Sequence, residues 1–178
     1  MSIGKRDNNL ILGRGSEVCD AEGKYNMKKI LILVRHAHAL PGYIAQVASD
    51  AARPLSEQGL QKADLTARRL EQLHVRPQCV ITSPLLRAVQ TAQTLGQVLQ
   101  APVWQEPLLN GLKPDQEVCD FLKEQLTHYN TVAAVTHNPS ISYVTHLLTG
   151  HVYTFAPGSF VMIEFDEKLQ LQQVTFGE

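Results

Sequence analysis

Residues 30–39 of this chain read Ile-Leu-Ile-Leu-Val-Arg-His-Ala-His-Ala. The five aliphatic residues that open the stretch predict a strand buried on both faces, as the strands of a parallel sheet are. The strand ends at Arg35 and His36. Open α/β sheets bind their ligands at the carboxyl ends of their strands, so this pair is a candidate binding site. An isolated Arg-His pair would more often begin an ordinary surface loop.

Two other segments bring basic side chains to the ends of predicted strands. A strand at 79–82 leads into a helix that carries Arg87 in its first turn, and a strand at 131–135 is soon followed by His137. If the three strands are neighbours, these two side chains can meet the Arg-His pair at one point.

Strands and helices alternate along most of the chain. Amphipathic helices are expected between the strands, with Ser56, Ser83 and Asp115 as N-caps. The alternation predicts an α/β fold, a three-layer α/β/α sandwich with a mostly parallel central sheet and a final edge hairpin. The strands are predicted at 30–34, 79–82, 101–104, 131–135, 160–165 and 169–174.

Composition excludes several classes of protein. The net charge of −1 gives no reason to expect nucleic acid or an anionic membrane as a partner. No apolar run is long enough to span a bilayer, and the amino terminus lacks the apolar core of a signal peptide, so we expect a cytoplasmic protein. The three cysteines, Cys19, Cys79 and Cys119, have no spacing typical of a zinc site or a disulfide framework. Cys79 and Cys119 are expected to be small core residues.

The length of 178 residues suits one domain with a substantial core. Residues 1–26 are polar and show no sustained periodicity, which predicts a flexible N-terminal extension outside the fold. A docking arm is the alternative for this segment. The domain itself is expected to cover residues 27–178.

The chain resembles the histidine phosphatase superfamily, also called phosphoglycerate mutase-like, whose hallmark is an Arg-His-Gly sequence after the first strand. It is most similar to the short branch of phosphohistidine phosphatases. The resemblance rests on four segments in the order of the family: Arg35-His36, 49–59 (Ser-Asp-Ala-Ala-Arg-Pro-Leu-Ser-Glu-Gln-Gly), 83–91 (Ser-Pro-Leu-Leu-Arg-Ala-Val-Gln-Thr) and 135–139 (Val-Thr-His-Asn-Pro).

The resemblance implies the fold of the superfamily and a role for each matching residue. His36 would be the nucleophile, and His137 would be the second histidine, which binds the phosphoryl oxygens. Arg35 and Arg87 would bind the phosphate as planar, bidentate donors. A neutral imidazole can attack phosphorus and form a phosphohistidine intermediate that water hydrolyses. These cationic and donor groups can supply the positive charge that a metal ion supplies elsewhere, so no metal and no cofactor is expected.

The chain departs from the family pattern at two places. Ala37 stands where the family has glycine, so the turn must tolerate a methyl group, which requires a negative φ. The carboxylic acid that protonates the leaving oxygen in larger family members has no counterpart in residues 107–112, although Glu106 is nearby. His38 is either a substitute acid or substrate contact, or a solvent-facing loop residue.

Arg53 has two open interpretations. Its position in the matching Arg-Pro-Leu segment suggests that it lines the approach to the phosphate. An ion pair with Asp50 is the alternative, and the sequence favours neither.

The missing acid indicates a class of substrate. An alkoxide leaves poorly unless it is protonated, whereas phosphohistidine can take a proton on its free ring nitrogen, which titrates near pH ~6.5, and depart as neutral imidazole. We therefore expect a phosphohistidine phosphatase that acts on a phosphorylated protein of a phosphorelay, with phosphate or another oxyanion in its pocket. The alternatives are a small-molecule phosphomonoesterase of the same superfamily and a non-catalytic module that binds phosphate or phosphohistidine.

Overall fold

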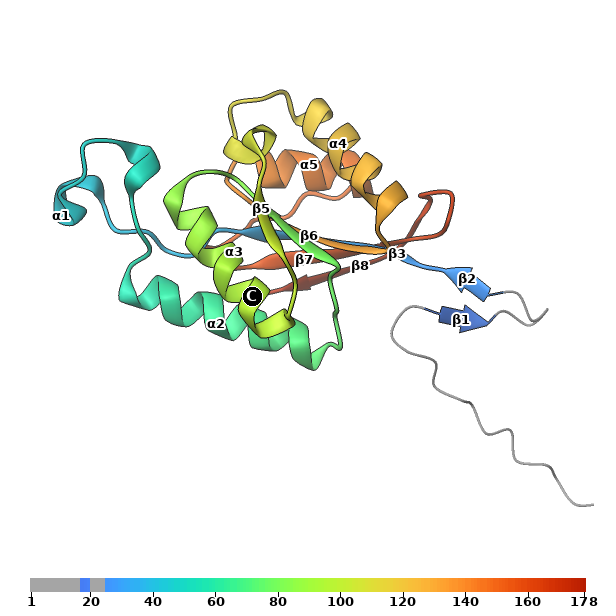
Figure 1. Cartoon of the computed structure of the whole chain (residues 1–178). Coiled ribbons are helices and arrows are strands. Elements are labelled where there is room, and N and C mark those ends of the chain that lie inside the picture. Colours follow the sequence, from blue (N-terminus) through green and yellow to red (C-terminus); the bar gives the residue numbers. More distant parts are fainter. Residues whose placement is uncertain (1–16, 20–24) are drawn as a thin grey trace, which may run out of the picture.

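A mixed sheet of six strands forms the centre of the protein (Figure 1). The structure is a computed structural model, and it describes residues 17–19 and 25–178. The strand order is β5-β4-β6-β3-β7-β8. Strands β5, β4, β6 and β3 are parallel to one another, and β7 runs antiparallel to both of its neighbours, β3 and β8. The strands are β3 (Lys29–Arg35), β4 (Cys79–Thr82), β5 (Val103–Gln105), β6 (Thr131–Thr136), β7 (Phe160–Phe165) and β8 (Leu171–Gly177). The predicted α/β class and the edge hairpin are confirmed.

Helices cover both faces of this sheet, as Figure 1 shows. On one face lie α2 (Glu57–Gln72) and α3 (Leu86–Leu99), and on the other α4 (Asp115–His128) and α5 (Ser140–Thr149). Side chains of a strand point alternately to its two faces. Accordingly Ile32 and Val34 of β3 pack in the core with α2 and α3, while Leu31 and Leu33 pack in the core with α4 and α5. The aliphatic run is therefore buried on both faces, and the three-layer sandwich is confirmed.

The pairing of the strands brings three of their carboxyl ends to one place. In the parallel pair β3·β6, Arg35 lies opposite Thr136, and in the pair β4·β6, Thr82 lies opposite Val135. The chain leaves all three strands at the same edge. Short helices stand in the loops that follow: α1 (Gly42–Ala45) and η1 (Asp50–Ala52) after β3, and η2 (Pro107–Asn110) after β5.

One of the three predicted N-caps is confirmed. The hydroxyl of Ser56 accepts a hydrogen bond from the N–H of Gly59 at 3.0 Å. Ser83 is not a cap, because α3 begins two residues later than predicted, after Leu85, and the Ser83 hydroxyl contacts His137 instead. Asp115 is also not the cap, since it is the first residue of α4 and its carboxylate accepts from the Ser140 hydroxyl.

A two-stranded antiparallel sheet precedes the domain. It consists of β1 (Glu17–Cys19) and β2 (Tyr25–Met27) and is separate from the six-stranded sheet. This hairpin was not among the predicted elements, since residues 17–27 show no strand periodicity. Residues 1–16 and 20–24 of the predicted extension lie outside the described residues, so its flexibility stays a prediction.

Two of the cysteines lie in the core as expected. Cys79 and Cys119 are free and buried, and burial raises the pKa of their thiols to about 12 and about 11. Within residues 17–19 and 25–178, no helix is long and apolar enough to cross a membrane.

We expect Gly59→Ala to destabilise the fold. The amino end of α2 passes so close to the segment after β3 that a Cβ at Gly59 would overlap the carbonyl oxygen of His38. Relief of this overlap must move backbone, so the free energy of unfolding should fall by about 1–3 kcal/mol. Urea denaturation measures it.

Gly42→Ala is the matched control, because a Cβ there would meet only the Val47 carbonyl oxygen at 3.8 Å. It should change the free energy of unfolding by less than about 1 kcal/mol. Equal effects of the two variants would contradict the close packing at Gly59.

Candidate functional site

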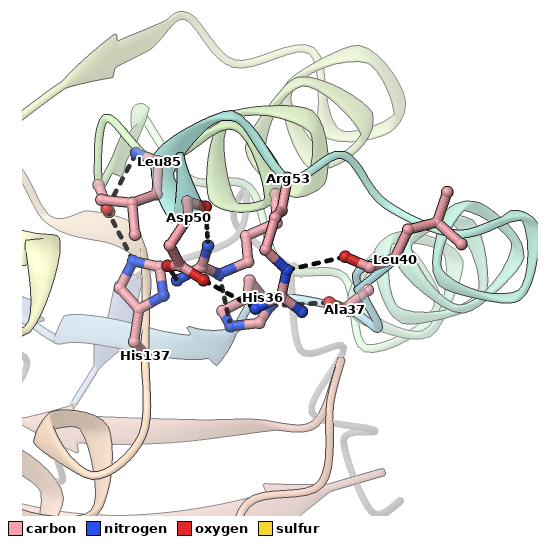
Figure 2. A network of polar contacts seen from close by, with 9 residues as sticks. His36, Ala37, Leu40, Asp50, Arg53, Leu85 and His137 are labelled. Atoms are coloured by element: carbon pink, nitrogen blue, oxygen red, sulfur yellow. Dashed lines mark hydrogen bonds and ion pairs between the residues drawn. The ribbon is translucent and has the colours of Figure 1, made fainter. Parts of the chain in front are cut away.

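His36 leaves the end of β3 with its ring held in one orientation. Its backbone N–H donates to the Thr136 carbonyl at 3.0 Å, which continues the pairing with β6. Its Nδ1 lies 2.7 Å from the carbonyl oxygen of Ala37, and Nε of Arg87 donates to its Nε2 at 3.3 Å. A carbonyl only accepts and a guanidinium only donates, so the proton is on Nδ1 and Nε2 carries a lone pair. Figure 2 shows this ring next to Ala37.

The surroundings keep His36 uncharged. Burial lowers its pKa to about 4, and the charges of Arg87, Arg35 and Arg53 act in the same direction against the raising effect of the Ala37 hydrogen bond. At neutral pH the ring is therefore neutral. A neutral ring whose Nε2 is unprotonated is the form that can act as a nucleophile.

His137 lies beside His36, with the ring centroids 4.9 Å apart. Its Nε2 is 2.7 Å from the hydroxyl oxygen of Ser83, which in turn accepts from the N–H of Leu85 at 3.3 Å. The Ser83 proton needs an acceptor, and Nε2 is the acceptor beside it, so we assign the ring proton of His137 to Nδ1. Burial lowers the pKa of His137 to about 3, and the charges of Arg87 and of His36 in its protonated form act in the same direction.

We call the group formed by Arg35, His36, Arg87 and His137 the pocket. Two of its buried donors lack a partner. They are Nδ1 of His137 and Nε of Arg35, and among the described residues they are the only buried side-chain nitrogen or oxygen atoms without a hydrogen bond. A buried polar group left unpaired costs about 1–3 kcal/mol. Arg35 is near enough to His137 for its charge to lower the pKa of that ring, so the two unpaired atoms belong to one group of side chains. Their presence indicates a site for a ligand that brings hydrogen-bond acceptors.

The two arginines of the pocket are held by backbone carbonyls. Nη1 of Arg35 donates to the carbonyl oxygen of Phe155 at 2.6 Å, and Nη1 of Arg87 donates to the carbonyl oxygen of Asp50 at 2.9 Å. The Arg87 residue is 8% exposed. The structure thus brings together all four residues that the sequence predicted to meet: Arg35, His36, Arg87 and His137.

Asp50 links Arg53 to this group, as Figure 2 shows. One carboxylate oxygen is 2.8 Å from Nη1 of Arg53, and the other is 3.0 Å from Nη2 of Arg87. Nε of Arg53 donates to the carbonyl of Leu40 at 2.8 Å, which ties the two ends of the loop together. The predicted ion pair is therefore present. The Arg53 charge also helps to lower the pKa of His36, so Arg53 belongs to the surroundings of the pocket as well.

His38 and Glu106 are engaged elsewhere. His38 is exposed, and its Nδ1 lies 2.8 Å from the hydroxyl oxygen of Ser56, the residue that caps α2. The Glu106 carboxylate accepts from the N–H of Leu108 at 3.0 Å and so caps η2. Neither contact is with the four residues of the pocket, and a role for His38 in the site stays a prediction.

Ala37 fits the turn after β3 without strain. It is fully buried, its N–H donates to the Thr91 hydroxyl at 3.1 Å, and it is not among the residues with positive φ. The expectation that φ stays negative here is confirmed. The methyl group packs with Leu55 and Ala63.

Sequence reasoning missed two contributors to the pocket. Ser83 was interpreted as a helix cap, and Asp50 only as a partner of Arg53, although both lie in segments that matched the family pattern. In the described part of the chain, no group of three or more His, Cys, Asp or Glu is placed to hold a metal ion.

Comparisons with known proteins agree with the geometry. A family model of the histidine phosphatase superfamily (branch 1) matches residues 31–113, which include Arg35, His36 and Arg87 but not His137. The phosphohistidine phosphatase SixA of Escherichia coli (strain K12) is 29% identical over 143 residues, 77% of this chain and 86% of SixA. A structure of the protein histidine phosphatase SixA with tungstate matches with a TM-score of 0.72 and 26% identity, over 84% of this chain and 94% of that one.

A further relative is known only as an uncharacterized protein of Picosynechococcus. It is 38% identical over 85 residues, and the match covers 48% of this chain. The chain matches only half the length (50%) of this relative.

We expect Ser83→Ala to weaken oxyanion binding without unfolding the protein. Loss of the hydroxyl removes the donor that keeps Nε2 of His137 unprotonated, so Nδ1 is no longer held as a donor. The affinity for tungstate should fall by roughly tenfold, the equivalent of one such hydrogen bond, in isothermal titration calorimetry.

Nitrogen-15 NMR of His137 reports the tautomer directly and should show it changed in this variant. Thr94→Ala is the matched control, because its hydroxyl bonds only the Gln90 carbonyl of its own helix. Unchanged affinity and an unchanged tautomer in Ser83→Ala would contradict the assignment.

Both pocket histidines should titrate far below the ordinary pH ~6.5 of histidine. In phosphate-free buffer, NMR should give midpoints near pH 4 for His36 and near pH 3 for His137. Since the pKa values in the folded state lie below those of the unfolded chain, the unfolded chain binds more protons in this range. Stability should therefore fall as the pH drops from about 6.5 toward 3. A midpoint near 6.5 for either ring would contradict the buried, neutral state.

Proposed function

Because this chain is a phosphatase of the histidine phosphatase superfamily, we propose that it dephosphorylates phosphohistidine on a protein by way of a covalent phosphoryl group on His36. The observation that carries the proposal is the neutral His36 ring, whose Nε2 lone pair lies in a pocket with two unpaired buried donors.

The phosphoryl group enters between His36 and the donors around it. Nε of Arg35 and Nδ1 of His137 lack acceptors in the pocket, and two phosphoryl oxygens would supply them. Nε of Arg87 turns from Nε2 of His36 to a third oxygen, which frees the lone pair for attack. Two guanidinium groups and a hydrogen-bond donor then balance the charge on the three oxygens, so the reaction needs no metal ion.

Transfer to the enzyme exchanges one P–N bond for another. Nε2 of His36 attacks phosphorus, the P–N bond of the substrate breaks, and its electron pair stays on the substrate ring. The His36 ring becomes positive, and the Nδ1–H bond to the Ala37 carbonyl stabilises that charge. Water then attacks phosphorus, releases phosphate and returns the electron pair to Nε2.

The substrate is assigned from the absence, among the described residues of the pocket, of a carboxylic acid that could protonate a leaving group. Glu106, the carboxylate nearest in sequence to the acid position of larger relatives, is committed to capping η2. Without a proton donor in the pocket, an alkyl phosphate would have to release an alkoxide, which leaves poorly. Protonated phosphohistidine instead leaves as neutral imidazole. The name of the Escherichia coli relative, a phosphohistidine phosphatase, supports this choice. We infer a cytoplasmic phosphorelay protein as the partner.

The two rival functions are less well supported. A small-molecule phosphomonoesterase would need the acid that Glu106 does not provide at the pocket. A non-catalytic binding module was suggested by Ala37 in place of glycine, but the Ala37 methyl group fits the turn without positive φ. The turn therefore gives no reason to expect a misplaced nucleophile.

The phosphoryl-enzyme is the test of this function. Wild-type protein mixed with phosphohistidine should show, in mass spectrometry without acid, a transient adduct of one phosphoryl group, and it should release phosphate. His36→Ala should lose the adduct and at least roughly 10³-fold in turnover, as expected for removal of a nucleophile.

His146→Ala is the matched control, since His146 is exposed on α5 and should leave both signals unchanged. Turnover of an alkyl phosphate with higher kcat/KM than phosphohistidine would overturn the proposed substrate. Binding of phosphohistidine without adduct or release would favour the binding module.

A further inference from the structure

Asp50 lies at the outer end of the Arg87 guanidinium. The inner nitrogen of that group, Nε, donates to Nε2 of His36, while Nη1 and Nη2 donate to the carbonyl and carboxylate oxygens of Asp50. The carboxylate is thus separated from the nucleophilic nitrogen by the width of one guanidinium. In-line transfer puts the leaving group opposite the nucleophile, so Asp50 is on the side where a leaving group departs.

The carboxylate is ionised and open to an arriving partner. Its side chain is 63% exposed. Its hydrogen bond with Arg53 is the largest influence and lowers its pKa, burial opposes this, and the charge and hydrogen bond of Arg87 add to the lowering, so the pKa lies below the ordinary value. Besides Arg53 and Arg87, Asp50 acts on His137, whose pKa it raises. Asp50 is therefore a negative charge at the mouth of an otherwise positive pocket.

Such a charge is unexpected for an enzyme that binds anions. A phosphate monoester arrives as a dianion, and a carboxylate beside it weakens binding by repulsion. The same carboxylate favours binding when the leaving group carries a positive charge. Protonated phosphohistidine has one N–H on its ring and a positive charge shared between its two nitrogens, which a carboxylate binds as a charge-assisted hydrogen bond.

We propose that Asp50 determines the specificity of the site for phosphohistidine by accepting a hydrogen bond from the protonated ring nitrogen of the leaving imidazole. This inference rests on the proposed function and deepens it. Asp50 replaces the missing acid without donating a proton, because the proton is already on the leaving group and Asp50 holds it there.

The proton and electron balance follows from this role. The substrate ring enters with a phosphoryl group on one nitrogen and a proton on the other. When the P–N bond breaks, its electron pair moves to the first nitrogen, and the ring departs as neutral imidazole with its proton retained. Asp50 stays a carboxylate throughout, and the phosphoryl group passes to Nε2 of His36.

Asp50→Asn tests the charge, because asparagine keeps the size of the side chain and one of the two oxygens that accept from Arg53 and Arg87. Wild type and variant are compared by kcat/KM on phosphohistidine and on 4-nitrophenyl phosphate, whose leaving group departs as an anion. We expect kcat/KM to fall at least ~10-fold more on phosphohistidine than on the aryl phosphate, the size of one charge-assisted hydrogen bond. Inhibition by inorganic phosphate should become stronger in the variant, since the repelling charge is gone.

The pH dependence of kcat distinguishes this role from a merely structural one, which would leave it unchanged. The ring proton of the bound substrate should persist to higher pH beside the carboxylate, so the alkaline limb of kcat should move to lower pH in Asp50→Asn, by about one unit. Asp50→Glu keeps the charge and should recover part of the preference for phosphohistidine.

Asp64→Asn is the matched control, because Asp64 pairs with Arg68 on the surface of α2. Equal losses on both substrates, or no loss on phosphohistidine, would overturn the role of Asp50 while leaving the proposed function intact. Failure of wild type to hydrolyse phosphohistidine, with turnover of the aryl phosphate, would overturn the proposed function and this inference with it.

Discussion

The hydrogen bond from Nδ1 of His36 to the Ala37 carbonyl is the contact on which the rest of the pocket depends. It decides which ring nitrogen carries the proton, and so it decides that Nε2 faces Arg87 with a lone pair. The contact exists because β3 ends at Arg35 and the chain turns at Ala37, which is buried and bonded to Thr91. The central strand β3 therefore sets the protonation state of the proposed nucleophile.

The pocket combines positive charge with neutral histidines. Burial and the nearby guanidinium groups disfavour protonation of either ring, and the pKa values of His36 and His137 fall to about 4 and about 3. A nucleophile and a hydrogen-bond donor are thus available at neutral pH in a site that also attracts anions. Asp50 limits that attraction at the outer edge, where it bridges Arg53 and Arg87. The proposed preference for a cationic leaving group has its origin in this balance.

Much of this arrangement could be predicted because it follows from local patterns and one topological rule. The aliphatic run before Arg35 defines a buried strand, and neighbouring parallel strands bring their ends together, so the meeting of His36 with Arg87 and His137 was predicted on the condition that the three strands are neighbours. The order β4-β6-β3 meets that condition. The Ser56 cap depends only on residues within one turn of helix. These features require no knowledge of how distant side chains pack.

The missed features are those that depend on such packing. The hydroxyl of Ser83 could cap α3, but it bonds a ring that arrives from β6, 54 residues later, and the helix begins without it. Asp50 was expected to pair with Arg53 three residues away, whereas its contact with Arg87 spans 37 residues and depends on how the loop folds back. A side chain with two competing partners cannot be assigned from sequence spacing alone.

A crystal structure with vanadate at neutral pH would test the central claim most directly, because vanadate adopts the five-coordinate geometry of phosphoryl transfer. We expect vanadium bonded to Nε2 of His36, with its equatorial oxygens accepting hydrogen bonds from Nε of Arg35, from Arg87 and from Nδ1 of His137. The axial oxygen opposite His36 should point toward Asp50. Vanadate bonded through another residue, or held with Nδ1 of His137 still unpaired, would contradict the account.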